Sequence, residues 1–72
     1  MKATLSRPSL ARILIDAGYD LLPVRSVWDP SRYEWEFYMD EAAAQIITDY
    51  YAKLGKRPPL IVKKFMEVYH HA

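Results

Sequence analysis

The chain of 72 residues contains no cysteine and only two glycines, and these absences exclude several kinds of site. Without cysteine the protein forms neither disulfides nor thiolate metal sites, so a cytoplasmic setting is expected. Gly18 and Gly55 each follow a helical pattern, so neither belongs to a glycine-rich phosphate loop. No apolar stretch is long enough to span a bilayer, and no basic segment followed by an apolar one indicates a secretory signal.

Histidine is also scarce, because His70 and His71 are the only two and are adjacent at the C-terminal end. A metal site needs three or four protein ligands, and no third ligand is close in sequence. No histidine lies inside the chain, where it would activate a serine nucleophile. Glu34 and Glu36 have a spacing similar to that of glycosidase carboxylates, but a hairpin provides no cleft for a sugar. The sequence therefore predicts no enzyme, no cofactor and no metal site.

The chain is rich in apolar and aromatic residues. Hydrophobic residues make up 51% of the chain, including six tyrosines, two tryptophans and two phenylalanines, which excludes intrinsic disorder. The length predicts a single domain, residues 1–72, near the size at which one core only marginally offsets chain entropy. We expect residues 1–6 to be a frayed end, with a short strand as the alternative.

The segment 33–39 has a strict period of two. Its large apolar side chains occupy every second position, at Tyr33, Trp35, Phe37 and Met39. Because successive side chains of a strand point to opposite faces, one face is apolar and the other carries two carboxylates. Residues 21–28 predict a partner strand in which Pro23, which has no amide hydrogen, faces a free edge. Residues 29–32 are typical of the turn that joins the two strands.

One register of this hairpin satisfies both of its faces. It places Val24 opposite Phe37, so that two apolar side chains meet on the inner face. It also places Arg25 opposite Glu36, so that unlike charges meet on the outer face. The sequence therefore predicts a two-stranded antiparallel hairpin in this register.

Three segments have the period of amphipathic helices. The first begins near Pro8, which suits a first helical turn, and ends at Gly18. The second follows Asp40, a favourable N-cap, and ends at Gly55. The third begins near Pro59 and runs toward the C-terminus. The expected fold is therefore a small α+β domain in the order α-β-β-α-α, with the helices packed on one face of the hairpin.

Several core and capping positions form an ordered set: a Leu10-Ala11-x-x-Leu14-x-x-x-Gly18 helix, an aromatic strand running into Asp40, a helix ending in Tyr50-Tyr51, a proline at 58 or 59, and a C-terminal helix that closes with Tyr69. In these features the chain resembles an uncharacterised family of short proteins encoded by phages and integrated mobile elements. The resemblance covers roughly residues 8–70 and implies a genomic setting. It transfers no catalytic or binding residue.

The charged residues are unevenly distributed. Residues 16–49 hold eight of the nine acids, whereas an acid-free group of cations surrounds the turn between the second and third helices: Lys53, Lys56, Arg57, Lys63 and Lys64. This group, the basic turn, is the predicted nucleic-acid-binding surface of our alternative hypothesis. The third helix begins with apolar residues where a groove-reading helix needs Arg, Asn or Gln, so we expect weak backbone contact or a solvated basic rim.

The outer face of the hairpin is expected to be more apolar than a surface exposed only to solvent. It holds Leu21, Pro23, Val27 and Tyr38, among the charged residues Arg25, Glu34 and Glu36. Both hairpin edges also lack strand partners. We therefore predict a partner-binding surface made of Leu21, Arg25, Val27 and Tyr38. A few scattered apolar side chains on a small monomer are the alternative interpretation.

The predicted function is a non-enzymatic protein–protein interaction module, an accessory protein of a phage or mobile element. Its partner is expected to be a host protein or a second copy of the chain in a homodimer, in the host cytoplasm, with no role for a membrane. The alternative is a nucleic-acid-binding protein that uses the basic turn.

Overall fold

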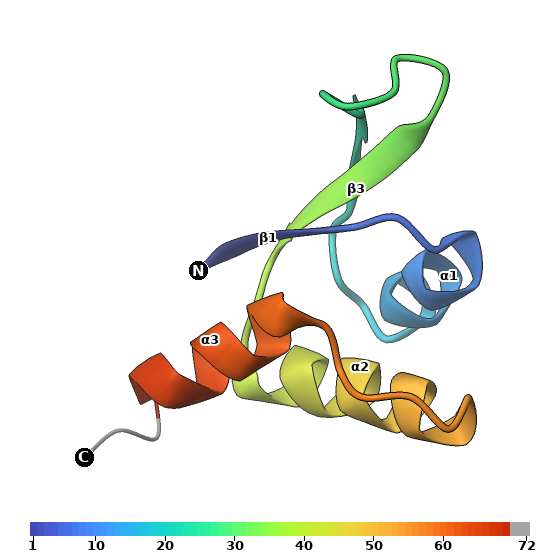
Figure 1. The fold of residues 1–72 in the computed structure, drawn as a ribbon. Coiled ribbons are helices and arrows are strands. Elements are labelled where there is room, and N and C mark those ends of the chain that lie inside the picture. Colours follow the sequence, from blue (N-terminus) through green and yellow to red (C-terminus); the bar gives the residue numbers. More distant parts are fainter. Residues whose placement is uncertain (70–72) are drawn as a thin grey trace. The chain divides into compact units, whose positions relative to one another are not determined.

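The computed structural model describes residues 1–69, and its elements follow one another as β1, α1, β2, β3, α2 and α3 (Figure 1). The strands are β1 Lys2–Leu5, β2 Leu22–Arg25 and β3 Tyr33–Tyr38, and the helices are α1 Pro8–Asp16, α2 Glu41–Lys53 and α3 Leu60–Tyr69. The described residues thus form a small α+β structure with a three-stranded antiparallel sheet. None of the described helices is long and apolar enough to cross a membrane.

The chain divides into two compact units. The sheet unit, residues 2–38, holds the three strands and α1. The helical unit comprises Met1 and the chain from Met39 onward, and it holds α2 and α3. The packing of α2 and α3 on the sheet and the single-domain organisation stay predictions.

Strand β1 corrects the expectation of a frayed N-terminus and of a two-stranded hairpin. It pairs antiparallel with β3, placing Ala3 opposite Phe37 and Leu5 opposite Trp35, so that β3 becomes the central strand in the order β1-β3-β2. A hairpin alone would leave one edge of β3 without backbone partners, and β1 supplies them. Ala3 is buried beside Phe37 as a result. The predicted order of elements was therefore wrong by one strand.

The predicted hairpin register was also wrong. Val24 faces Glu34 rather than Phe37, a shift of three residues, and Arg25 faces Tyr33 rather than Glu36. An odd shift moves every side chain of β2 to the other face of the sheet. The cause is the length of the connection, because the backbone N–H of Ser26 donates to the carbonyl of Arg32 at 2.9 Å and residues 26–32 form a loop, not strand and tight turn.

Pro23 occupies the edge strand β2 as expected. Ser26 directs its amide toward β3, and amides along an antiparallel strand alternate in direction. The nitrogen of Pro23, three positions earlier, therefore faces away from β3, where the missing hydrogen costs no bond of the sheet.

The helix ends agree with the sequence signals. The Asp40 side chain caps α2 by accepting from the backbone N–H of Ala43 at 2.7 Å. Gly18 and Gly55 adopt the left-handed conformation, with φ of 99° and 68°. In each case the backbone N–H groups of the glycine and of the residue after it donate back to the last turn of the helix, in the paired pattern of a Schellman motif. Arg7 is the N-cap of α1, and its side chain makes no capping hydrogen bond to the helix.

Both units bury apolar side chains. In the sheet unit the buried residues are Ala3, Leu10, Ala11, Leu14 and Phe37, and in the helical unit they are Met39, Ala43, Ala44, Ile47, Val62 and Phe65. Only Phe37 and Met39 of the predicted aromatic stripe are buried, since Trp35 is half-buried and Tyr33 is 53% exposed. The outer half of that stripe is therefore available at the surface.

Candidate functional site

The connection between β2 and β3, residues 26–32, is held by hydrogen bonds from its own side chains; we call it the hairpin loop. Ser26 Oγ accepts from the backbone N–H of Trp28 at 3.3 Å and of Asp29 at 3.4 Å. Asp29 Oδ1 accepts from the backbone N–H of Ser31 at 3.1 Å and from its hydroxyl at 2.6 Å. Such short-range side-chain bonds define turns, so the loop has a specified backbone conformation.

The carboxyl group of Asp29 is an acid with a lowered pKa. The hydrogen bond from the Ser31 hydroxyl contributes most to the lowering, the bond from the Ser31 amide adds to it, and the positive charge of Arg32 acts in the same direction. Each of these interactions favours the carboxylate over the neutral acid. A negative charge therefore lies directly beside Trp28 in the hairpin loop.

The same loop presents two apolar side chains to solvent. Trp28 is 91% exposed and Val27 is 85% exposed. The hydrogen bonds to Ser26 and Asp29 involve the backbone of the loop, so they constrain the main chain without covering the indole. A tryptophan that leaves almost its whole surface in water, next to an exposed valine, forms a protruding apolar contact.

Arg25 connects the hairpin loop to the strands. Its guanidinium lies over the Tyr33 ring at 5.7 Å from the ring centroid, and its Nη1 donates to the carbonyl of Pro30 at 3.2 Å. The first contact is a cation–π interaction and the second holds the loop against β2. The register explains the first contact, because Arg25 and Tyr33 are directly opposite and share one face.

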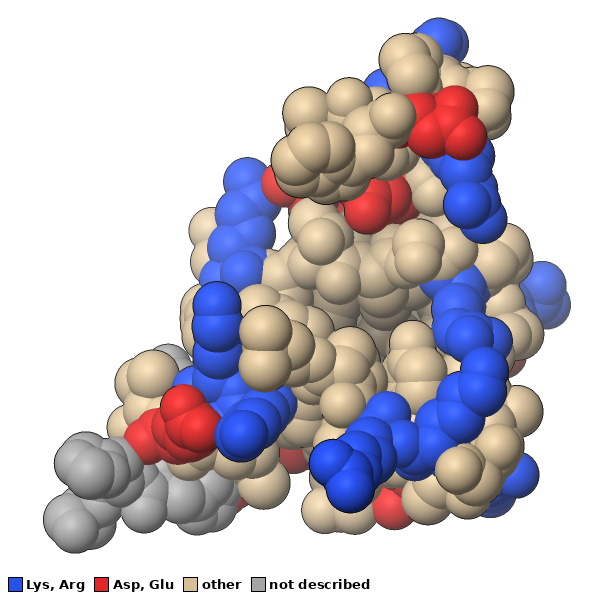
Figure 2. Space-filling view, viewed as in Figure 1, with Lys and Arg blue, Asp and Glu red and all other residues tan. Residues whose placement is uncertain are grey.

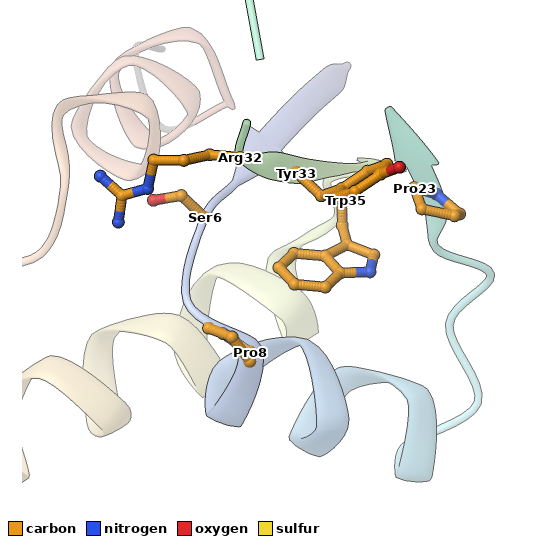
Figure 3. A pocket seen from close by; sticks show the side chains of 6 residues that line it. All are labelled: Ser6, Pro8, Pro23, Arg32, Tyr33 and Trp35. Carbon is orange, nitrogen blue, oxygen red and sulfur yellow. The ribbon is translucent and has the colours of Figure 1, made fainter. Parts of the chain in front are cut away.

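A hollow of about 540 Å³ lies on the same face of the sheet unit. Figure 3 shows the indole of Trp35 pointing from β3 toward α1, with Pro23 of β2 on one side and Ser6 and Pro8 on the other. We call it the aromatic hollow, and its lining residues are Ser6, Pro8, Pro23, Arg32, Tyr33 and Trp35. Its lining combines aromatic and proline rings with one permanent cation, which suits an apolar group that carries a nearby anion.

The opposite face of the sheet carries the acids. Glu36 forms an ion pair with Lys2 of β1 at 3.4 Å, which replaces the predicted pair between Glu36 and Arg25. Glu34 lies on this face as well, since it is two residues from Glu36 on β3. A second hollow, of about 320 Å³, is lined by Lys2, Asp20, Leu22, Glu36, Phe37 and Tyr38. The two faces thus differ in charge, with arginines on the aromatic side and carboxylates on the other.

The predicted partner-binding residues do not share one face. Tyr38 is 74% exposed on the acidic face, whereas Arg25 lies on the aromatic face with Tyr33. Val27 belongs to the hairpin loop, and Leu21 precedes β2 and is half-buried. Only Arg25 and Val27 therefore belong to one end of the sheet unit, and partner binding by the four residues stays a prediction.

The basic turn lies entirely in the helical unit, and its five cations are all exposed: Lys53, Lys56, Arg57, Lys63 and Lys64. Lys53 is the last residue of α2, and Asp49, one turn earlier, accepts a hydrogen bond from Gln45 at 2.9 Å. Within residues 1–69 no ion pair occupies any of these cations. Figure 2 shows that lysine and arginine side chains predominate over acidic ones on the face it presents.

The residues that the structure describes contain no candidate metal site. Among the residues that the structure describes, no group of three or more His, Asp or Glu side chains could hold a metal ion. His70 and His71, the pair considered from the sequence, lie outside the described residues.

Sequence reasoning missed the exposure of Trp28 and the aromatic hollow. It assigned Trp28 to a strand, although Ser26 two residues before it and the pair Asp29 and Ser31 after it are residues that form short side-chain turns. That spacing was the available signal for a longer loop. The hollow had no comparable signal, because Pro8, Pro23 and Trp35 come from three different elements.

Comparisons of this chain with protein-family models, with curated proteins and with solved structures returned no match.

Proposed function

We propose that this protein is a non-enzymatic interaction module that binds another protein chain, and that the hairpin loop makes the central contact. The observation that carries the proposal is the combination of order and exposure in this loop: Ser26 and Asp29 constrain its backbone, whereas Trp28 is 91% exposed. In line with the resemblance noted above, we propose an accessory protein of a phage or mobile element that acts in the host cytoplasm.

The side chains at this end of the sheet unit are of the types that contribute most to binding. Tryptophan, tyrosine and arginine are enriched among interface hot spots, and Trp28, Tyr33 and Arg25 lie on or beside the hairpin loop. The cation–π contact and the bond to Pro30 hold Arg25 before any partner arrives. A contact surface ordered in advance loses less conformational entropy on binding.

The non-enzymatic part of the proposal rests on the chemistry of the side chains. The chain has no thiol, and the described residues that line the aromatic hollow contribute the hydroxyls of Ser6 and Tyr33 and the guanidinium of Arg32. A serine needs an adjacent base to become a nucleophile, and arginine stays protonated. The hollow is therefore better suited to binding than to proton transfer.

The test is capture of partners from lysate of the cells that express the protein, with Trp28→Ala as the variant. We expect at least one protein to be retained by the wild type and lost with Trp28→Ala, since truncating a central tryptophan removes about 2 kcal/mol or more of binding free energy.

Leu60→Ala is the matched control for this experiment. Leu60 is 63% exposed and lies in α3 of the helical unit, so its truncation also removes an exposed apolar side chain, but outside the proposed contact. Equal retention of every protein by the wild type, Trp28→Ala and Leu60→Ala, together with no self-association, contradicts the proposed function.

Nucleic-acid binding through the basic turn is the second candidate, favoured by one specific observation. Lys56 and Arg57 are exposed in the connection between α2 and α3, and Lys63 and Lys64 are exposed near the start of α3. Side chains that are free of carboxylate partners within residues 1–69 neutralise phosphates without first breaking an ion pair.

Fluorescence anisotropy with mixed-sequence duplex and single-stranded DNA over a salt series tests this candidate. A role in nucleic-acid binding predicts a Kd that rises steeply with salt and a shallower salt slope for Lys56→Glu with Arg57→Glu, because fewer counterions are then released. Arg12→Glu, which reverses one exposed cation of the sheet unit, is the comparison, and the effects are compared per reversed charge. Binding that is weak and equally affected by both changes removes the basic turn as a specific site.

A further inference from the structure

Two features at one end of the sheet unit complement each other. The hairpin loop projects the Trp28 indole into solvent with the Asp29 carboxylate next to it. The aromatic hollow has Trp35 and Arg32 among its lining residues, and the Arg32 side chain extends away from the Trp35 indole (Figure 3). The hairpin loop therefore presents an aromatic ring beside an anion, Trp28 and Asp29. The aromatic hollow of the same unit suits a group of that kind.

We propose that the partner bound by the hairpin loop is a second copy of this chain, with Trp28 of each copy inserted into the aromatic hollow of the other and Asp29 facing Arg32 of that copy. This inference rests on the proposed function, because the same loop makes the contact, and it adds the identity of the partner. The product is a homodimer with two equivalent contacts.

The hydrogen bonds of the loop oppose insertion of Trp28 into the hollow of its own chain. Ser26 Oγ binds the Trp28 amide, and the Ser26 amide donates to Arg32 at the other end of the loop. The backbone is thus closed across the loop while Trp28 stays 91% exposed. The main chain at Trp28 is therefore held in a conformation in which the indole stays in solvent and outside the hollow of its own chain.

The dimensions suit a tryptophan. The hollow, of about 540 Å³, is widely open to solvent and has room for an indole, which is smaller than a typical ligand of pockets of about 300–1,000 Å³. A tryptophan buries about 150–250 Å² on its own. The total surface area buried in the dimer would approach about 1,000 Å², near the lower end of specific interfaces. This area comprises two indoles, two Val27 side chains and the surfaces of the two hollows that they cover. A reversible dimer is therefore expected rather than an obligate one.

The arrangement also closes on itself. Because the proposed contact is reciprocal, a twofold rotation that inserts one Trp28 inserts the other at the same time. Such an isologous contact ends at two copies and leaves no unfilled hollow at either end. The assembly is predicted to be a dimer, without larger polymers.

Single-stranded nucleic acid suits this end of the molecule less well. Successive bases need several free aromatic faces, and Arg25 covers one face of the Tyr33 ring at 5.7 Å, whereas a single indole needs only one free face. Phosphates would also meet the Asp29 carboxylate beside Trp28, the most exposed ring. The acid that repels a phosphate is the same group that Arg32 of a second copy attracts.

The test is sedimentation velocity of the full chain from low to high micromolar concentration, with tryptophan fluorescence on the same samples. The wild type is expected to shift from monomer to dimer with a blue shift of the emission, as the exposed Trp28 enters an apolar site. Trp28→Ala is expected to raise the dimer Kd by about thirtyfold or more, the effect of losing a hot-spot residue.

A second variant damages the hollow and leaves the loop intact. Tyr33 is 53% exposed and lies under Arg25, so Tyr33→Glu is tolerated by the fold while it puts a carboxylate in the path of Asp29. Neither variant is expected to dimerise alone. Mixed together they retain one intact contact, the Trp28 of Tyr33→Glu in the hollow of Trp28→Ala, so a heterodimer weaker than the wild-type dimer is expected.

The outcomes separate this inference from the proposed function. A wild type that stays monomeric at high micromolar concentration overturns the inference, as does a dimer that persists in Trp28→Ala or a mixture of variants that forms no heterodimer. Leu60→Ala, the exposed apolar control, is expected to dimerise like the wild type. If the wild type stays monomeric and binds a different protein through Trp28, the inference fails and the proposed function survives. If it stays monomeric and binds an oligonucleotide through Trp28, the inference also fails, and the proposed function gains no support.

Discussion

At the scale of single residues, the aromatic strand β3 divides into a buried end and an exposed end. Phe37 is 4% exposed, whereas Tyr33, four residues earlier on the same face, is 53% exposed. Burial decides how much a side chain contributes to the free energy of unfolding, since truncation of a buried ring removes both its transfer free energy and its packing. The two aromatic residues are therefore expected to differ in role, Phe37 in stability and Tyr33 in binding.

We predict that Phe37→Ala lowers the free energy of unfolding by about 3–5 kcal/mol, as expected for a buried aromatic side chain. Tyr33→Ala, at the exposed end, is expected to cost less than about 1.5 kcal/mol, mainly the lost contact with Arg25. Urea denaturation followed by far-UV circular dichroism measures both. Equal losses for the two variants would show that the burial of β3 is described incorrectly.

At the scale of elements, the helix ends are determined by their flanking residues. Gly55 follows α2 with a φ of 68°, and a Cβ built on it meets no atom within 4 Å. Any cost of substitution there is therefore conformational and not steric crowding by other residues. The backbone hydrogen bonds that Gly55 and Lys56 donate to the last turn of α2 depend on this conformation.

We predict that Gly55→Ala lowers the free energy of unfolding by about 1 kcal/mol, because alanine disfavours a left-handed backbone. Gly55→Asn is expected to lose less, since asparagine tolerates that conformation better. Thermal denaturation of the three proteins ranks them. A Gly55→Ala protein as stable as the wild type would mean that α2 ends differently in solution.

The hairpin loop has its own dependence on pH. The folded-state pKa of Asp29 lies below its ordinary value of 3.8, chiefly because of the Ser31 hydroxyl. The carboxylate therefore stabilises the loop fully at pH values above its ordinary pKa. This contribution is lost as the pH falls through the lowered pKa. The loop should therefore stay ordered at neutral pH and loosen only in strong acid.

We predict that an NMR titration of the Ser31 amide reports a midpoint below 3.8. Asp29→Asn removes the titrating group, so the amide shift of Ser31 is expected to lose that transition while the rest of the sheet unit titrates unchanged. A midpoint at or above the ordinary value would contradict the hydrogen bonds described for the loop.

At the scale of the whole molecule, small size and exposed apolar surface favour association. A chain of 72 residues buries a limited core, and its exposed large apolar side chains include Val27, Trp28, Leu22 and Tyr38. Binding of the folded state to itself stabilises that state by mass action. The thermal stability of the protein should then depend on its concentration.

We predict that the Tm of the wild type rises by a few degrees between dilute and concentrated samples, because dimerisation removes only folded monomers from the unfolding equilibrium. The Tm of Trp28→Ala is expected to stay constant over the same range, since the exposed side chain contributes to association and not to the core. Differential scanning calorimetry at several concentrations provides the comparison. A constant Tm for the wild type would argue against a dimer that forms in this range.

Much of the local structure was predictable from the sequence by itself. The period of two over residues 33–39, the cap at Asp40 and the glycines after two helical patterns identified β3, the start of α2 and two helix ends. These features depend on interactions within a few residues, such as the bond from the Ala43 amide to Asp40 at 2.7 Å. The residue types at neighbouring positions contain that information directly.

The pairing of the strands was decided by the tertiary structure. Lys2–Leu5 has no periodic signal and becomes a strand only because β3 offers it a free edge, and that strand brings Lys2 to Glu36. The register of β2 followed from the hydrogen-bonded loop after Ser26, which moved Arg25 onto the aromatic face. The aromatic hollow likewise required Pro8, Pro23 and Trp35 to come together from separate elements. Side chains distant in sequence meet only after chain folding, so local patterns determined the elements while pairing across the sheet determined the surface available to a partner.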